Sequence, residues 1–369
     1  MIQSLLISLP MIVCLFWAAF FCIRLLPRKS RMFSLQYETP RVTAILALFY
    51  LMATVLYTDH WLYFSGIESV WGEWSYGVVN LCVYPLYYAY LRVLTRAKKS
   101  IEVPILLIPA VAALILFPIG RFGLCIANEP MFLVIRICFT IQVIWVLIRG
   151  WQLLKSTIRR MDDTYSDDRS RLLYPTHVSL LIFGITAVVS MILNFMGRDF
   201  FAHGTSVVLP AIVMTTLLYG LGYIAAHTIV PPEAVAEETT SEQNHPEEDT
   251  NTLIHKIDML MRKNELFRNS ELTIYDLARA TNSNRTYVSM AINQAYNVNF
   301  ATYVNRFRIE ESKRILADSS IKQDKEAISY AQTMSGFQTE QTFYRVFKEL
   351  TGTTPLLYRR STRSLTADF

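Results

Sequence analysis

The stretch "SGFQTEQTFYRVFKELTGTTP", residues 335–355, decides the fold of the C-terminal part of the chain. Its Gly336 and Phe337 lie in a predicted tight turn. Thr339 then stands where a side-chain oxygen caps the start of a helix. The following residues have apolar side chains at helical spacing, with basic side chains between them. The stretch therefore predicts a turn followed by an amphipathic, basic helix.

Gly352 and Pro355 mark the end of this helix, because glycine accepts a left-handed C-cap and proline cannot continue a helix. The residues before the turn, "KEAISYAQTM" at 325–334, also have helical spacing. A short helix, a tight turn and a second helix make a helix-turn-helix arrangement.

An earlier segment repeats this arrangement. Thr273 caps the short helix "IYDLARA", and Asp276 stands at its third position, as in a capping box. Asn282 falls in the turn, where asparagine tolerates the left-handed conformation, and Asn284 caps the next helix. A long helix over 299–318 joins the two units. The sequence predicts an all-helical domain over 253–369.

Residues 253–360 resemble the DNA-binding domain of AraC-type (AraC/XylS family) transcription regulators. The positions that carry the resemblance are Leu277, Ala278, 284–289, Ile292, Asn293, Phe300, Tyr303, Arg306, Arg308, Gly336, Phe337, Phe343, Phe347, Lys348, Gly352, Thr354, Pro355, Tyr358 and Arg359. The resemblance implies that each second helix enters a major groove of double-stranded DNA.

Carried onto this sequence, the resemblance assigns base reading to one face of each second helix. The candidates are Arg285, Thr286, Ser289 and Met290 in the first unit and Glu340, Gln341, Tyr344 and Arg345 in the second. A further set of basic residues either contacts phosphates or closes local ion pairs. This set is Arg306, Arg308, Lys348, Arg359 and Arg360.

The second unit departs from the family at two positions. Ala331 and Gln332 stand where the family usually has an Ile-Ala pair that packs under the reading helix. We expect a cavity or a buried amide there, which would loosen the unit. In the first unit, Met290 occupies a place where family members often have a polar residue.

The 369-residue chain is 52% hydrophobic, and its charges divide it into apolar (1–230), acidic (231–252) and mildly basic (253–369) zones. The apolar zone contains seven runs long enough to cross a bilayer, which takes about 20 residues. These runs are 4–26, 41–58, 76–95, 101–120, 131–153, 173–196 and 206–229.

The connections between these runs differ in basic residues. The first, third and fifth are rich in Lys and Arg, whereas the second, fourth and sixth hold only Arg121 and Arg198. By the positive-inside rule, the N-terminus is outside and residue 231 onward is in the cytoplasm. We therefore expect a seven-span helical bundle in a bacterial inner membrane. This front end and the "YVSMAIN" form resemble the membrane-tethered members found in Bacteroidetes-type bacteria.

The outer connection at 58–76 is aromatic and includes Trp61, Trp71 and Trp74. It is typical of an aromatic belt at the headgroup level, or of a mouth for a small or amphiphilic signal. Arg136 either reaches outward from the fifth run or pairs inside the bundle.

The acidic zone, 231–252, begins with two prolines and is expected to be a disordered linker. The whole chain is interpreted as a membrane-tethered regulator that couples an outer-face or intramembrane signal to promoter binding, with homodimerisation an additional expectation. The alternative is a membrane receptor or transporter whose cytoplasmic tail binds proteins. No nucleophile–base set or metal cluster is evident, so we expect neither an enzyme nor a cofactor.

Overall fold

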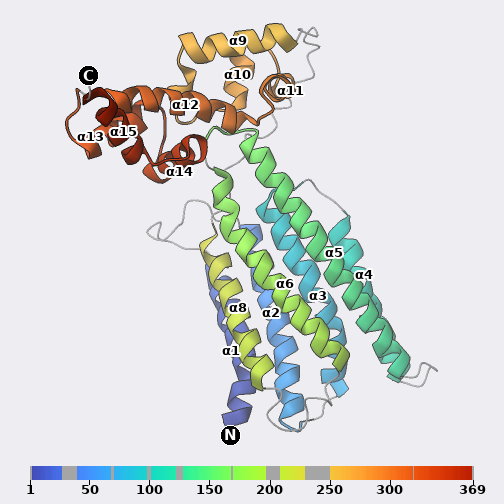
Figure 1. The fold of residues 1–369 in the computed structure, drawn as a ribbon. Coiled ribbons are helices and arrows are strands. Elements are labelled where there is room, and N and C mark those ends of the chain that lie inside the picture. The colour runs from blue at the N-terminus through green and yellow to red at the C-terminus, as the bar shows by residue number, and fades with distance from the viewer. Residues whose placement is uncertain are drawn as a thin grey trace. The chain divides into compact units, whose positions relative to one another are not determined.

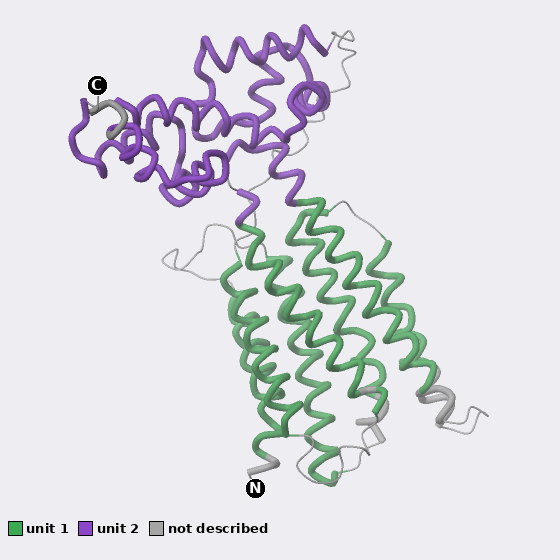
Figure 2. Tube along the Cα trace, in the orientation of Figure 1, with its two compact units in different colours: residues 1–157, 172–232 green, residues 158–171, 233–369 purple. Residues whose placement is uncertain are grey.

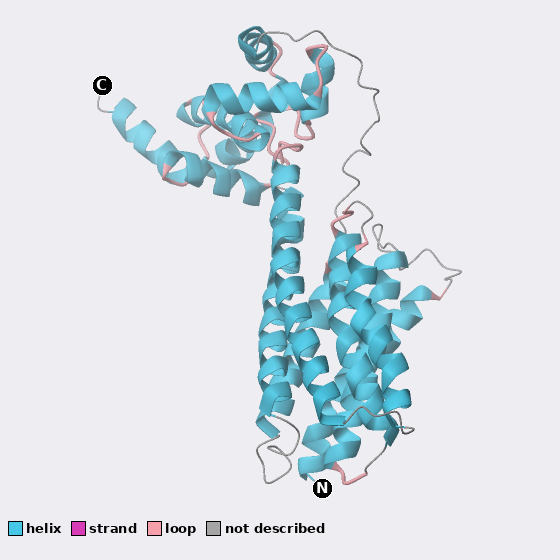
Figure 3. Ribbon diagram, turned by 90° about the vertical axis from the view of Figure 1, so that its right-hand side faces the viewer, coloured by secondary structure: helices cyan, strands magenta, loops and turns pink. Residues whose placement is uncertain are grey.

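The computed structural model describes residues 2–26, 40–67, 70–97, 101–121, 128–167, 169–196, 208–228, 250–318 and 320–367. Over these ranges the chain is helical, with no strand apart from one isolated antiparallel bridge between Tyr165 and Thr273 (Figure 3). It divides into two compact units, Met1–Thr157 with Leu172–Pro232 and Ile158–Arg171 with Glu233–Phe369 (Figure 2). The all-helical expectation is confirmed for the described ranges.

The first unit is a bundle of long helices that lie side by side (Figure 1). Its helices are α1 (Ile2–Leu25), α2 (Pro40–Phe64), α3 (Val70–Leu94), α4 (Glu102–Arg121), α5 (Asn128–Asp162), α6 (Tyr174–Met196) and α8 (Val208–His227). In the bundle, α1 packs against α2 and α8, and α3 packs against α2 and α4. Each helix overlaps one of the predicted apolar runs.

Five stretches of the described chain are helices long and apolar enough to cross a membrane. They are Leu5–Leu25, Pro40–Phe64, Leu133–Asp162, Arg169–Leu193 and Val208–His227. In α4 the described apolar stretch is shorter, Glu102–Ile115. The count of seven spans stays a prediction.

The bundle has an aromatic interior and an aliphatic exterior. The buried ring side chains include Tyr50, Tyr87, Phe139 and Phe183. Ile108, Ile141 and Leu181 point outward and are 60%, 63% and 59% exposed. Large exposed apolar surfaces mark protein or membrane contacts, and this one extends over several helices.

The described part of the second unit contains eight further helical segments. They are α9 (Thr250–Lys263), η3 (Leu266–Arg268), α10 (Ile274–Ala280), α11 (Arg285–Tyr296), α12 (Phe300–Ala317), α13 (Asp324–Met334), α14 (Glu340–Thr351) and α15 (Pro355–Ala367). The second unit also includes the segment Ile158–Arg171. This segment begins with the end of α5 and closes in the 3₁₀ turn η2 (Arg169–Leu173).

Helix α12 joins two separate hydrophobic cores. Its N-terminal part contributes Phe300 and Val304 to the core beneath α9, α10 and α11. Its C-terminal part contributes Ile309 and Leu316 to the core beneath α13, α14 and α15. One helix thus holds both helix pairs, α10/α11 and α13/α14.

Two details differ from the sequence-based expectations. Pro355, predicted only as a stop, is the first residue of α15, a position that suits proline because the first helical N–H needs no partner. Helix α9 begins at Thr250, inside the predicted linker. The rest of that linker, 231–249, lies outside the described residues.

Candidate nucleic-acid interface

The first helix pair has the predicted caps. The Thr273 side chain accepts from the Asp276 amide, and the Asp276 carboxylate accepts from the Thr273 amide at 2.9 Å, which completes the capping box. Asn282 has the left-handed φ of 53°. The Asn284 side chain then accepts from the Tyr287 amide at 3.0 Å and fixes the start of α11. These four predictions are confirmed.

Helix α11 has a buried face and a face open to solvent. Val288, Ala291 and Ile292 are buried in the first core. The four candidate readers lie on the other side: Thr286 and Met290 are exposed, whereas Arg285 and Ser289 are half-buried. The predicted reading face therefore exists as a surface.

The second pair follows the same plan. Gly336 has φ 83°, and the Thr339 side chain accepts from the Thr342 amide at 3.2 Å to cap α14. Gly352, with φ 76°, ends the helix in the left-handed conformation. Phe343 and Phe347 are fully buried. The predicted turn, N-cap and C-cap are confirmed.

The four candidate base-reading side chains of α14 differ in their exposure and in their partners. Glu340 and Gln341 are exposed. Tyr344 is half-buried, with its ring 6.0 Å from that of Phe343, and burial raises the pKa of its phenol. Arg345 donates to Glu349 one turn later at 2.6 Å. Any DNA contact of Arg345 must therefore compete with this ion pair.

Burial contradicts the phosphate assignment of Arg308, which is 1% exposed. Its guanidinium donates to the carbonyl oxygens of Phe267 and Asn269, both at 2.8 Å, and to the carbonyl and hydroxyl oxygens of Ser166 at 3.0 and 2.9 Å. Burial lowers the pKa of Arg308 to about 10, and the charge of Asp167 opposes this shift. Arg308 is an internal cross-link of the second unit.

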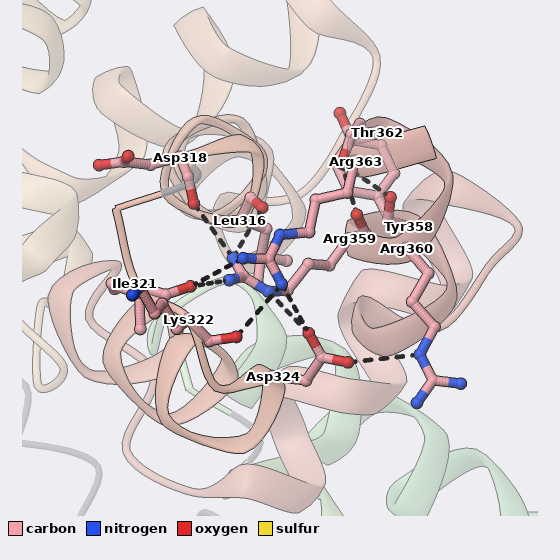
Figure 4. Close-up of polar contacts among 10 residues, drawn as sticks. All are labelled: Leu316, Asp318, Ile321, Lys322, Asp324, Tyr358, Arg359, Arg360, Thr362 and Arg363. Carbon is pink, nitrogen blue, oxygen red and sulfur yellow. Dashed lines mark hydrogen bonds and ion pairs between the residues drawn. The ribbon is translucent and has the colours of Figure 1, made fainter. Parts of the chain in front are cut away.

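Arg359 is likewise enclosed, with its side chain fully buried (Figure 4). Its Nε donates to Asp324 at 3.1 Å. Its other nitrogens donate to the carbonyl oxygens of Leu316 (3.1 Å), Asp318 (3.2 Å) and Ile321. The phosphate assignment is wrong here too, and the alternative of a local ion pair is correct.

The other three cations of the phosphate set lie at the surface. Arg306 and Lys348 are exposed. Arg360 is 65% exposed, with its Nε 3.3 Å from Asp324 (Figure 4). Their exposure leaves the phosphate assignment of these three a prediction, and Arg360 already has a carboxylate partner.

The two departures from the family pattern do not leave an unpaired buried amide. Ala331 is fully buried in the second core, and Gln332 is half-buried. The Gln332 amide donates to the Phe337 carbonyl oxygen at 3.4 Å, across the turn before α14. That amide braces the turn instead of loosening it, contrary to our expectation.

The candidate sensing residues belong to the first unit. Trp61 lies in α2 and is half-buried, as is Arg136 in α5. Trp71 and Trp74 fall in α3, but their side chains lie outside the described part of the structure. These assignments stay predictions.

Asp324 connects helices α13 and α15 through its carboxylate. It begins α13 and pairs with Arg359, Arg360 and Arg363 (Figure 4). The hydrogen bond from Arg359 is the main cause that lowers the Asp324 pKa. A lowered pKa in the folded state contributes stability above the unfolded pKa of about 3.9, and this stability is lost as pH falls through the folded pKa.

We therefore expect Asp324→Asn to weaken the docking of α15 at neutral pH and to remove part of the acid sensitivity of this region. Hydrogen exchange of residues 355–367, measured in the full chain between pH 6 and pH 3, checks this. Glu326→Gln, on an exposed side chain of the same helix, is the control. Equal acid sensitivity of the parent and Asp324→Asn would contradict the assignment.

Residues 277–361, which begin within α10 and include α11, α13 and α14, match the family model described as a helix-turn-helix domain. The C-terminal part of the chain is an AraC-type helix-turn-helix domain. It is 34% identical over 98 residues to the uncharacterized HTH-type transcriptional regulator YtdP of Bacillus subtilis, and 35% identical over 88 residues to the uncharacterized HTH-type transcriptional regulator YisR of the same organism.

These alignments cover 26% and 24% of this chain, but only 12% and 29% of the two relatives. No solved structure matches the chain. The resemblance drawn from the sequence is confirmed for the helix-turn-helix domain, and the family model covers residues 277–361 alone.

Proposed function

We propose that the chain is a membrane-tethered transcription regulator that binds double-stranded DNA in a sequence-specific manner. The observation that carries this proposal is the pair of capped helices, α11 and α14, each with an exposed polar face, inside a helix-turn-helix domain. The two helix pairs act as two helix-turn-helix units, and α12 sets their spacing. Each second helix enters a major groove.

Base reading falls to the exposed residues near each helix start. Gln341 suits adenine, Glu340 accepts from cytosine, and Arg285 suits guanine. Arg306, Lys348 and Arg360 then contact phosphates, which fix the register without reading the sequence. The domain's net positive charge supports binding that weakens as salt rises.

The tether is the seven-span bundle of residues 1–230, in the bacterial inner membrane. Its aliphatic exterior supports this location. Arg24 near the end of α1 donates to the Ala226 carbonyl near the end of α8 at 3.3 Å, so these two helix ends lie together. Arg92 and Arg149, from two basic connections, both pair with Glu102. Such pairing supports one common cytoplasmic side.

The acidic linker then leads to the DNA-binding domain in the cytoplasm. A small or amphiphilic signal, received at the outer face or within the bilayer near Trp61 or Arg136, changes the bundle and with it promoter occupancy. Association of two tethered chains as a homodimer raises the effective concentration of the domains at a two-site promoter.

We expect Gln341→Ala to weaken binding to the chain's own promoter fragments by roughly 5- to 150-fold, the worth of one base-reading contact. Lys348→Ala should instead weaken specific and non-specific binding alike and reduce the salt slope by about 1. Genome-wide occupancy of the full chain supplies the fragments. Binding by the full chain in lipid nanodiscs at two salt concentrations then compares the variants.

An occupancy map without specific sites would reject the proposal. Unchanged transcription in Gln341→Ala and Arg345→Ala cells would instead favour a receptor whose tail binds proteins.

A further inference from the structure

The connection between α5 and α6 contains three consecutive buried residues. Thr164, Tyr165 and Ser166 are 5%, 3% and 1% exposed. Connections normally run over the surface, because buried backbone polar groups need partners. These residues belong to the second unit, together with the helix-turn-helix domain (Figure 2). They are therefore docked on that domain.

The docking uses backbone pairing. The Ser166 amide donates to the Leu272 carbonyl at 3.1 Å, and the Ile274 amide donates to the Thr164 carbonyl at 3.0 Å. These two bonds enclose the bridge between Tyr165 and Thr273. Thr273 is also the N-cap of α10. The connection is thus fastened to the residue that begins the first helix pair.

Arg308 binds the same connection through its guanidinium. It holds both oxygens of Ser166 while it binds Phe267 and Asn269 of the first half. Its guanidinium also lies 5.7 Å from the ring centre of Phe337, in the turn before α14. One side chain therefore contacts the connection, the η3 segment that precedes α10, and the turn between α13 and α14.

Two acidic residues bear on this docking, one on its stability and one on its effect on DNA binding. One oxygen of Asp167 pairs with Arg169 at 2.8 Å, but the other is buried without a hydrogen bond, which disfavours the docked state. Asp163 lies close enough to the candidate reader Arg285 for the arginine's charge to act on it, although burial has the larger effect and raises the Asp163 pKa. A DNA phosphate approaching Arg285 would meet this carboxylate.

We propose that Thr164–Asp167 is an intramolecular clasp that docks on the first helix pair through Thr273 and Arg308 and restrains its binding to DNA. Helix α5 runs without a break from Asn128 to Asp162, and the clasp begins two residues later. A movement of α5 that undocks the clasp also carries Asp163, the residue just before it, away from Arg285. This inference rests on the proposed function, because it assigns the regulation of the same DNA-binding surface.

The bridge offers a direct test. Tyr165 and Thr273 form a non-hydrogen-bonded antiparallel pair, whose Cα atoms lie about 4.5 Å apart, within the range that a disulfide spans. In the full chain in nanodiscs, the Tyr165→Cys/Thr273→Cys variant should form this disulfide under mild oxidation. The oxidised form should bind the promoter fragment roughly fivefold more weakly than the reduced form, the effect of one screened charge contact. The parent chain under the same oxidant is the control.

A second variant opens the clasp without touching the α10 cap. Ser166→Pro removes the amide that donates to Leu272 and should raise promoter affinity by a similar factor, while hydrogen exchange in α11 and α14 stays as in the parent. Absence of the disulfide overturns the docking. A disulfide with equal DNA affinity in both forms overturns the regulation. A disulfide with no specific DNA binding in either form overturns the proposed function and, with it, the regulatory role.

Discussion

Gly336→Ala is expected to destabilise the second helix pair by about 3 kcal/mol, from left-handed strain of about 1–2 kcal/mol and overpacking of about 1–3 kcal/mol. Gly336 has φ 83°, and a Cβ there would lie 2.5 Å from the Phe267 carbonyl oxygen and 2.6 Å from that of Arg268. Both contacts are to backbone, which cannot move aside as a flexible side chain does. The substitution would push the turn before α14 away from the first half.

Hydrogen exchange of the full chain in nanodiscs measures this effect, because protection in α13 and α14 should fall by roughly a hundredfold. Gly352→Ala is the matched control. It has a similar φ of 76°, but no atom lies within 4 Å of its added Cβ. Gly352→Ala should therefore show only the cost of left-handed backbone strain. Equal losses of protection in the two variants would contradict the close approach at Gly336.

The features that the sequence predicted well are local. Thr273, Asn284 and Thr339 each cap a helix through the amide three residues further on, and Gly352 ends α14 through its own backbone conformation. Each depends on the chemistry of a few neighbouring residues, which a single sequence displays. The exposed faces of α11 and α14 follow from the same helical periodicity.

The features that it missed depend on distant partners. Arg308 and Ser166 are separated by 142 positions, and Arg359 and Leu316 by 43. A partial signal was available for Arg308, because it is four residues from buried Val304 and Ser312 on the same helix face. An arginine on a buried face indicates an internal cross-link, whereas Arg306 points elsewhere and is exposed.

The docking of the α5–α6 connection had no comparable signal. Its residues are polar and charged, as in a solvated cytoplasmic loop, and the positive-inside rule uses only its basic residues. The hydrogen bonds that bury it are mainly made by backbone groups, which are the same in every sequence. Only the arrangement in space assigns Ile158–Arg171 to the second unit.

Arg359→Met should destabilise the second helix pair by about 1–3 kcal/mol, because the buried carbonyl oxygens that Arg359 binds would lose their donor. Methionine fills a similar volume, but it cannot donate to Asp324 or to the carbonyl oxygens of Leu316 and Ile321. Protection from hydrogen exchange in α13 and α15 should therefore fall, and DNA binding should weaken because α14 has lost part of its support.

Arg360→Met is the matched comparison, because Arg360 shares the carboxylate of Asp324 but is 65% exposed. It should cost less than about 1 kcal/mol, as exposed ion pairs do, and should change DNA binding mainly through the salt slope. If Arg359 acted on phosphate instead, the pattern would reverse: Arg359→Met would keep full protection and flatten the salt dependence. The two adjacent arginines thus separate a residue that holds the fold from one whose side chain is mostly exposed.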